Sequence, residues 1–319
     1  MKVSVLINNY NYQNYVVEAI ESVLQQSVKV DEIIVVDDRS TDDSARILQD
    51  KFGQSEAVKL ILKEQNEGQL AAFQAGFEAS TGDLVCFLDA DDLYKETYIE
   101  TILKFYQAHP VCEFLFLSAD FFGAEERISS CYPPQCFSKR NYRDLGYSKL
   151  TTLHRKTWIG HRTSTVSMRR SVLEKLFPLP FLEDWRIRAD DCLVYGASIV
   201  GARKFYLEAP LVKYRVHGSN GHYGTLKTKP PDYFDRYNQS VDRLFDFLAQ
   251  KFDIPGSVAH EFKSIAHPLP EEFETARSLL RGLKLSRPQK LLMLSSMSVH
   301  FLINGVTKPS IDSSSHRKL

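Results

Sequence analysis

Acidic side chains cluster at two points in the first third of the sequence, each directly after a short apolar run. Asp37 and Asp38 follow residues 32–36, and residues 89–92 (Asp-Ala-Asp-Asp) follow residues 84–88. Carboxylates this close together repel one another unless something neutralises them. Mg²⁺ and Mn²⁺ accept carboxylate oxygens and keep coordination sites open for phosphate. The pattern therefore predicts a site for Mn²⁺ or Mg²⁺ together with a substrate that carries phosphate.

The elements that would position these residues follow from the apolar pattern. Residues 3–7, 32–36, 58–62 and 84–88 are short, apolar and non-alternating, which predicts strands, and helical spacing fills the segments between them. This rhythm predicts an α/β fold with a mostly parallel sheet covered by helices on both faces. Ligands of such sheets bind beyond the carboxyl ends of the strands. Both acidic clusters and the polar run Asn8-Asn9-Tyr10-Asn11 should therefore open onto one crevice.

Beyond residue 120 the rhythm breaks. Residues 125–165 are rich in Arg, Lys, Tyr, Ser and Pro, which predicts a loop-heavy segment. Residues 191–200 and 231–252 are predicted to be helices, and residues 204–207 and 211–216 to be two strands.

Composition excludes several classes of protein. Forty basic residues balance forty acidic ones, so bulk charge indicates no nucleic-acid partner. Residues 1–120 hold 21 Asp and Glu against 9 Lys and Arg, which makes the remainder basic.

The five cysteines show no zinc spacing and predict a reducing compartment, with Cys131 and Cys136 lacking nearby partners. Without a signal peptide or a spanning segment, the expected location is cytoplasmic.

Four motifs in order make the chain resemble the family 2 glycosyltransferases, which have the GT-A fold. The similar stretches are residues 5–11 with 18–26, residues 33–42, Asn66-Glu67-Gly68, and residues 87–92. They cover residues 1–120 densely, and weaker similarity runs to about residue 220. The resemblance implies a Rossmann-like GT-A sheet. It also implies an inverting, metal-dependent hexosyltransferase that moves a sugar from a nucleoside diphosphate sugar, most often a UDP-sugar, to a glycan or lipid-linked acceptor in cell-surface polysaccharide biosynthesis.

The resemblance assigns the nucleotide to the first two strand ends. Asn9, Tyr10 and Asp38 would hold the base and ribose, with Asp37 close by. The chemistry agrees, because an aromatic ring can stack on a base and a carboxylate can accept an N–H of uracil. Asn66 and Gly68 would pack beside the nucleotide.

The resemblance also indicates which residues would bind the cation and the diphosphate. Asp91 would ligate the cation, and Asp89 would face the ribose or the cation. Residues 214–220 are similar to the family's closing segment, in which His217 would approach the metal or the diphosphate and Arg215 would clamp its charge.

An inverting transfer needs a general base that deprotonates the acceptor hydroxyl. Family members usually place it in a Glu-Asp pair at the start of a helix, and residues 188–193 (Arg-Ala-Asp-Asp-Cys-Leu) match that region. Because the pair here is Asp-Asp, Asp191 is favoured as the base and Asp190 stays an alternative. Adjacent carboxylates tend to raise one pKa, which suits a base.

Each motif also has a purely structural interpretation. Asp37-Asp38 and Asp190-Asp191 could cap helices, Asn66–Gly68 could be a mere turn, and His217 an ordinary loop residue. Trp158, Trp185 and His161 lie where acceptor contacts would fall, but core or surface roles fit them equally.

Three other functions compete with the transferase. A nucleotidyltransferase also has an acidic metal site, but it usually carries a Gly-rich loop after the first strand, and residues 8–13 contain no glycine. A phospho-acceptor receiver module would be much shorter. A catalytically inactive nucleotide-sugar binder remains open if Asp190 and Asp191 are not placed for catalysis.

The chain is predicted to have three parts. Residues 1–120 would bind the nucleotide sugar, residues 121–225 would form the acceptor side, and residues 226–319 would form a helical C-terminal extension. Residues 281–319 hold seven Lys and Arg and one Asp, and residues 291–306 are uncharged. Such a helix could lie on the inner face of an anionic membrane, or pack on the catalytic domain.

Overall fold

The computed structural model describes residues 1–124, 141–218, 220, 230–252, 262–263, 270–282 and 287–304. Cys131 and Cys136 lie outside these residues. The chain forms two compact units, the first made of residues 1–148 and 158–246 and the second of residues 149–157 and 247–319. The predicted functional division at residues 120 and 225 stays a prediction.

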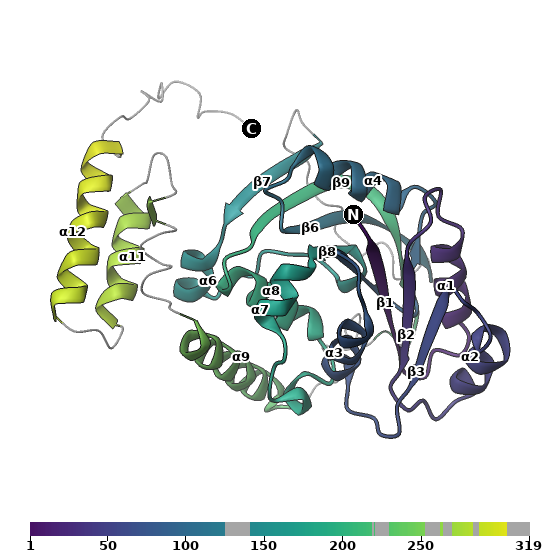
Figure 1. The fold of residues 1–319 in the computed structure, drawn as a ribbon. Coiled ribbons are helices and arrows are strands. Elements are labelled where there is room, and N and C mark those ends of the chain that lie inside the picture. The colour runs from purple at the N-terminus through teal and green to yellow at the C-terminus, as the bar shows by residue number, and fades with distance from the viewer. Residues whose placement is uncertain are drawn as a thin grey trace, which may run out of the picture. The chain divides into compact units, whose positions relative to one another are not determined.

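A nine-stranded sheet forms the centre of the first unit, in the order β3-β2-β1-β4-β8-β6-β9-β5, with β7 paired to β9 (Figure 1). The first four strands of this order are parallel, as predicted. They are β1 (Val3–Asn9), β2 (Glu32–Asp37), β3 (Val58–Leu62) and β4 (Leu84–Asp89). Their apolar, non-alternating sequences suit strands that are covered on both faces.

The second half of the sheet is mixed. Strand β8 (Val166–Arg169) runs antiparallel to both β4 and β6 (Phe114–Gly123), whereas β6 and β9 (Arg203–Val216) are parallel. The short β5 (Leu93–Tyr94) and β7 (Tyr142–Tyr147) pair antiparallel with β9.

Two expectations about this half are corrected. The two strands expected at residues 204–207 and 211–216 form one strand, because β9 continues through the residues between them. An irregularity marks this point, where the register between β9 and β6 shifts between Leu117 and Ala119. The described part of the segment expected to be loop-heavy, residues 141–165, contains β7, the helix α6 (Lys149–Arg155) and the 3-10 turn η1 (Thr163–Thr165).

Helices cover both faces of the sheet. Apolar residues of α1 (Val16–Leu24), α2 (Ser44–Phe52) and α4 (Tyr98–Ala108) share one core with Val5 and Ile7. On the opposite face α3 (Gln69–Ala79) contacts β1 and β2, and the rings of Phe73 and Phe87 meet edge to face. The thiols of Cys86, Cys112 and Cys192 are free and buried in the core.

Among the described residues, the other helices of the first unit follow β8. They are α7 (Arg170–Leu176), the short η2 (Leu182–Trp185), α8 (Ala189–Ile199) and α9 (Tyr233–Lys251), whose last turn belongs to the second unit. In the second unit α11 (Pro270–Gly282) contacts both α6 and α12 (Arg287–Asn304). Among the described residues, no helix combines the length and the apolar character needed to cross a bilayer.

Candidate active site

A cavity of about 790 Å³ opens at the carboxyl ends of the parallel strands, within the first unit. Its walls come from the segments that follow β1, β2 and β4, from the start of α3 and α8, and from residues 158–163. The predicted crevice is therefore present. Of the site residues expected from the sequence, those that line it are Asn9, Tyr10, Asp38, Asn66, Gly68, Asp89, Asp91, Asp190 and Asp191.

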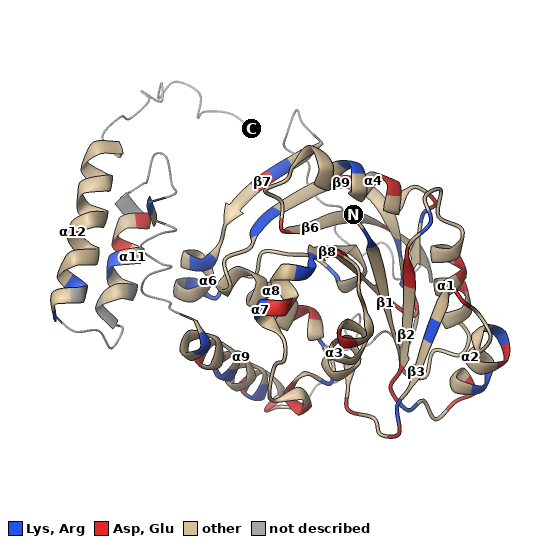
Figure 2. Cartoon of the chain, in the orientation of Figure 1, with Lys and Arg blue, Asp and Glu red and all other residues tan. Residues whose placement is uncertain are grey.

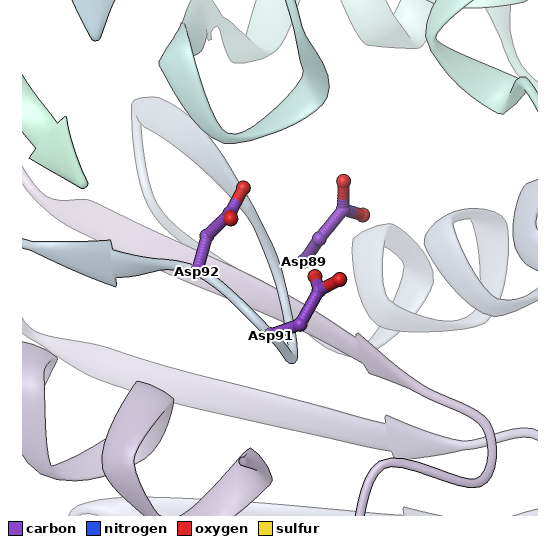
Figure 3. Close-up of side chains that lie close together, drawn as sticks. All are labelled: Asp89, Asp91 and Asp92. Carbon is purple, nitrogen blue, oxygen red and sulfur yellow. The ribbon is translucent and has the colours of Figure 1, made fainter. Parts of the chain in front are cut away.

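The loop after β4 presents an acidic cluster. Carboxylate oxygens of Asp89, Asp91 and Asp92 lie within 4.8 Å of one another, and Figure 3 shows the three side chains rising to the same side of this loop. Both oxygens of Asp92 accept hydrogen bonds, one from Ser164 Oγ at 2.6 Å and one from the Arg215 backbone N–H at 2.8 Å. Asp92 therefore braces the loop, and Asp89 and Asp91 are the two that line the cavity.

Burial and mutual repulsion raise the free energy of ionising this cluster when no counter-charge is present. Burial, followed by the charge of Asp91, raises the pKa of Asp89 to about 8. The pKa of Asp92 is raised as well, first by burial and then by Asp91 and Asp89. A divalent cation would relieve this repulsion, and carboxylate oxygens are the ligands that Mg²⁺ and Mn²⁺ prefer. The residues present therefore fit such a cation.

His217 and Arg215 reach the cluster from the end of β9 rather than from the cavity wall. His217 Nε2 lies 3.0 Å from Asp91 Oδ2. The Arg215 guanidinium donates to the backbone carbonyl of Asp91 at 2.8 Å and to Glu18 at 2.6 Å. Both side chains therefore hold the acidic loop in position, and their direct contact with a ligand stays a prediction.

On the nucleotide side the two adjacent aspartates have different surroundings. Asp37 is buried, accepts hydrogen bonds from Asn9 Nδ2 at 2.7 Å and from Ser40 Oγ at 2.6 Å, and is absent from the cavity wall. Asp38 lines the cavity and accepts from Lys63 Nζ at 2.8 Å and from the Gly68 N–H at 2.6 Å. The ring of Tyr10 is 43% exposed and lines the same wall.

Gly68 occupies a position that only glycine fits. Its φ is +97°, and an added Cβ would lie 2.4 Å from the Cα of Arg186. Such a contact is impossible without moving the backbone. Arg186 also donates hydrogen bonds to Asn66 through its guanidinium. The close approach therefore joins the loop before α3 to the segment before α8.

Gln69 is a site residue that sequence reasoning missed. Its side-chain N–H donates to Asp89 Oδ1 at 3.0 Å, and its side-chain oxygen accepts from the Ala189 backbone N–H at 3.0 Å. It therefore links the acidic cluster to the first turn of α8. The available signal was a polar residue directly after the Asn66–Gly68 motif, at the start of a predicted helix.

The two candidate bases lie in the first turn of α8, in unlike environments. Asp191 is 1% exposed, and its Oδ2 accepts from Arg188 Nε at 2.8 Å and from the Tyr237 hydroxyl at 2.9 Å. Asp190 is only partly buried. Burial, followed by the charge of Asp191, raises the pKa of Asp190 to about 7. Asp190 therefore holds a proton more readily than an exposed aspartate does.

The residues expected on the acceptor side differ in their exposure to solvent. Trp158 and His161 line the cavity, and Trp158 is 36% exposed. Trp185 is 2% exposed and its ring meets Tyr237 edge to face, so it is a core residue. Arg162, which sequence reasoning passed over, also lines the cavity.

Comparisons with known proteins relate the chain to glycosyltransferases. The profile described as Glycosyl transferase family 2 matches residues 4–177. An uncharacterised glycosyltransferase of Nostoc sp. is 38% identical over 223 residues, which cover 70% of this chain and 67% of that protein. The putative teichuronic acid biosynthesis glycosyltransferase TuaG of Bacillus subtilis is 37% identical over 114 residues, 36% of this chain and 45% of TuaG.

The fold also matches solved structures. The crystal structure of Staphylococcus aureus TarS residues 1–349 in complex with UDP-GlcNAc superposes with a TM-score of 0.57 at 19% identity, covering 94% of this chain and 81% of that one. Another crystal structure of the same TarS fragment contains UDP. At this identity the likeness shows the GT-A fold, in agreement with the prediction.

Proposed function

Because the chain belongs to glycosyltransferase family 2 and is a glycosyltransferase, we propose that it transfers a sugar, with inversion, from a UDP-sugar to a glycan or lipid-linked acceptor of cell-surface polysaccharide biosynthesis. One observation carries the proposal. Asp38, Asp91 and the Asp190–Asp191 pair, from three distant parts of the sequence, all line a single cavity. The nucleotides in the TarS crystals and the teichuronic acid role in the name of TuaG support the choice of donor and pathway class.

The donor would lie along the ends of β1 and β2. The exposed ring of Tyr10 offers a face for the base, and Asp38 is fixed by Lys63 and by the Gly68 N–H. A carboxylate fixed in this way is pre-organised to accept a hydrogen bond without rearrangement. Asn9 acts indirectly in this proposal, through its hydrogen bond to Asp37.

Asp89 and Asp91 would hold Mg²⁺ or Mn²⁺, with His217 supporting Asp91. A bound cation of this kind supplies Lewis-acid stabilisation of the departing nucleoside diphosphate. Gln69 would keep Asp89 oriented toward the first turn of α8, so that the donor and the base face each other.

The acceptor proton would pass to the Asp190–Asp191 pair. A general base works best when its pKa lies near the working pH. The raised pKa of Asp190, about 7, meets this condition, whereas Asp191 is already ion-paired with Arg188. In this proposal Asp190 accepts the proton, and Asp191, which the sequence favoured, raises its proton affinity and anchors the helix turn.

A lipid-linked acceptor would require the protein to approach a membrane. On α12 the exposed large apolar residues are Leu291, Leu292, Val299, Leu302 and Ile303, and at helical spacing they form one stripe. Figure 2 shows no acidic residue on this helix, and its charged residues, Arg287 and Lys290, lie at its start. An apolar stripe with basic flanks suits an anionic bilayer surface.

Release of nucleoside diphosphate tests the proposed reaction. The full chain would be incubated with UDP-, GDP- and dTDP-sugars and Mn²⁺, with and without EDTA. We expect UDP release that EDTA abolishes and that Asp91→Asn lowers at least about 100-fold, the scale at which lost electrostatic stabilisation acts. Asp50→Asn, at an exposed aspartate of α2 that does not line the cavity, is the matched control and should retain activity.

Three results would contradict the proposal in different ways. Pyrophosphate release would indicate a nucleotidyltransferase. UDP binding without turnover of any sugar would indicate an inactive nucleotide-sugar binder. Undiminished turnover in EDTA would remove the cation from the reaction.

A further inference from the structure

Arg162 carries a positive charge into the cavity without a carboxylate partner. Its guanidinium carbon lies 4.8 Å from the centre of the Phe121 ring and 4.6 Å from that of Tyr214. No hydrogen bond or ion pair joins the guanidinium to any residue in the described part of the chain. Two aromatic rings hold the cation in place by cation–π attraction, and its N–H groups stay available to a ligand.

The sheet order places Arg162 opposite the nucleotide residues. Arg162 directly precedes η1 and β8, while Phe121 and Tyr214 belong to β6 and β9. Asn9 and Asp38 lie at the ends of β1 and β2, on the other side of β4. The acidic cluster at the end of β4 therefore separates the two regions. A group bound by Arg162 would belong to the molecule that enters from the acceptor side.

Among the described residues on the acceptor side of the cavity, Arg162 carries a positive charge that no carboxylate offsets. Burial, with the charge of Arg162, lowers the pKa of His161 to about 4, so His161 is neutral at physiological pH. Arg188 is neutralised by Asp191. Arg186 donates to Asn66, beside the nucleotide residues. Asp89, Asp91 and Asp190 face the same cavity, and the cation of the proposed function would offset the charge of the first two.

Trp158 adds an apolar face beside this charge. It lies four residues before Arg162, lines the same cavity and is 36% exposed. A large, rigid ring at the rim of a polar cavity gives contact area at a low cost in entropy. A flat, partly apolar ring with an anionic substituent would match both residues.

We propose that Trp158, Arg162 and Tyr214 form an acceptor subsite, the Arg162 subsite, which binds a sugar carrying a phosphate or a carboxylate. This inference rests on the proposed function, because it assumes that a donor fills the other side of the cavity. Phosphate and carboxylate share the same recognition by a guanidinium, which presents its N–H groups as a fork.

Calorimetric titration of the full chain, saturated with UDP and Mg²⁺, tests the subsite. The probes are glucose, glucose 6-phosphate and glucuronic acid, which separate the neutral, phosphate and carboxylate cases. We expect at least one anionic probe to bind about tenfold or more tighter than glucose, as hydrogen bonds to charged groups allow. Arg162→Gln should bring that probe to the level of glucose, while the affinity for UDP stays unchanged.

Two further variants sharpen the test. Arg162→Lys keeps a charge between the rings and should retain part of the preference for the anionic probe, and Arg46→Gln is the matched arginine control. Equal or absent binding of all three probes would overturn the inference. The inference would also be overturned if Arg162→Gln lost as much affinity for UDP as for the anionic probe. That result would assign Arg162 to the donor diphosphate.

Failure of the proposed function would look different. It would appear in the nucleotide-release assay, as pyrophosphate release or as UDP binding without turnover of any sugar, or as a wild-type chain that does not bind UDP at all. The same titration without UDP would then still decide whether Arg162 selects anionic sugars.

Discussion

Asp190 and Asp191 are neighbours in the chain, yet their surroundings give them different chemistry. The carboxylate of Asp191 is buried against Arg188 and Tyr237, whereas Asp190 lines the cavity without an ion pair of its own among the described residues. Burial and the neighbouring charge of Asp191 raise the pKa of Asp190, because each disfavours a negative charge at this position. Asp191 is ion-paired with Arg188, so in our proposal the role of proton acceptor falls to Asp190.

Paired substitutions separate the roles of these two residues. Asp190→Asn should lower kcat about 100-fold or more while UDP binding persists, because it removes the proton acceptor. Asp191→Asn should keep measurable turnover and move the acid limb of the kcat/KM profile to lower pH, since loss of a neighbouring negative charge lowers the pKa of Asp190.

Steady-state rates between pH 5 and 9 measure both effects. Near-normal turnover of Asp190→Asn together with an inactive Asp191→Asn would instead assign the base to Asp191.

At the scale of elements, a buried lysine on β9 contacts two segments whose other residues line the cavity, and the strand β6. Lys204 Nζ donates to the backbone carbonyls of Ile159 and Val194, both at 2.8 Å, and lies 4.5 Å from the centre of the Phe114 ring. These contacts connect the segment that carries Trp158 and Arg162, and the helix α8, to the sheet. Burial lowers the pKa of Lys204 well below its usual value.

This lowered pKa predicts a pH-dependent stability. Between the folded pKa of Lys204 and its unfolded value of about 10.4, the unfolded chain binds more protons, so stability rises with pH. Relative to Lys204→Met, the free energy of unfolding of the wild type should increase by up to about 1.4 kcal/mol per pH unit in that window. Urea unfolding from pH 6 to 10 measures the difference, and parallel curves for the two proteins would contradict the prediction.

At the scale of the whole molecule, charge and exposed apolar surface are unevenly distributed along the chain. The acidic first 120 residues contain the cation cluster, and the basic C-terminal region contains the apolar stripe of α12. Helix α11 covers part of α12, and Met297 is fully buried, whereas Leu292 and Ile303 are more than 70% exposed. Exposure of large apolar side chains on one helix face is characteristic of a docking surface.

Vesicle co-sedimentation tests that surface with the full chain. Binding to vesicles with an anionic lipid should exceed binding to neutral vesicles, and Leu292→Gln with Ile303→Gln should weaken it at least about tenfold, because two large apolar side chains no longer enter the bilayer. Leu24→Gln, at a 40% exposed leucine on α1, is the matched control. Equal sedimentation of all variants would contradict membrane docking, and a dimer that the double variant dissociates would assign the stripe to a second copy.

Local sequence was enough to predict the sheet edge where the site lies. Apolar runs of five residues define the parallel strands, and polar clusters directly after three of them must meet at one edge because parallel strands end on the same side. For the same reason Asp38, Asp89 and Asp91 could be expected near one another before any coordinates were known.

Tertiary structure decided what each of those residues is able to do. Asp37 points into a turn formed with Ser40. Asp191 is ion-paired with Arg188 and accepts a hydrogen bond from Tyr237 of α9, and Arg162 is held by rings from β6 and β9. Burial, ion pairing and proton affinity depend on atoms that are distant in sequence, and no local pattern encodes those partners. The sequence by itself therefore determined where the chemistry is located, and packing determined which side chains are free to perform it.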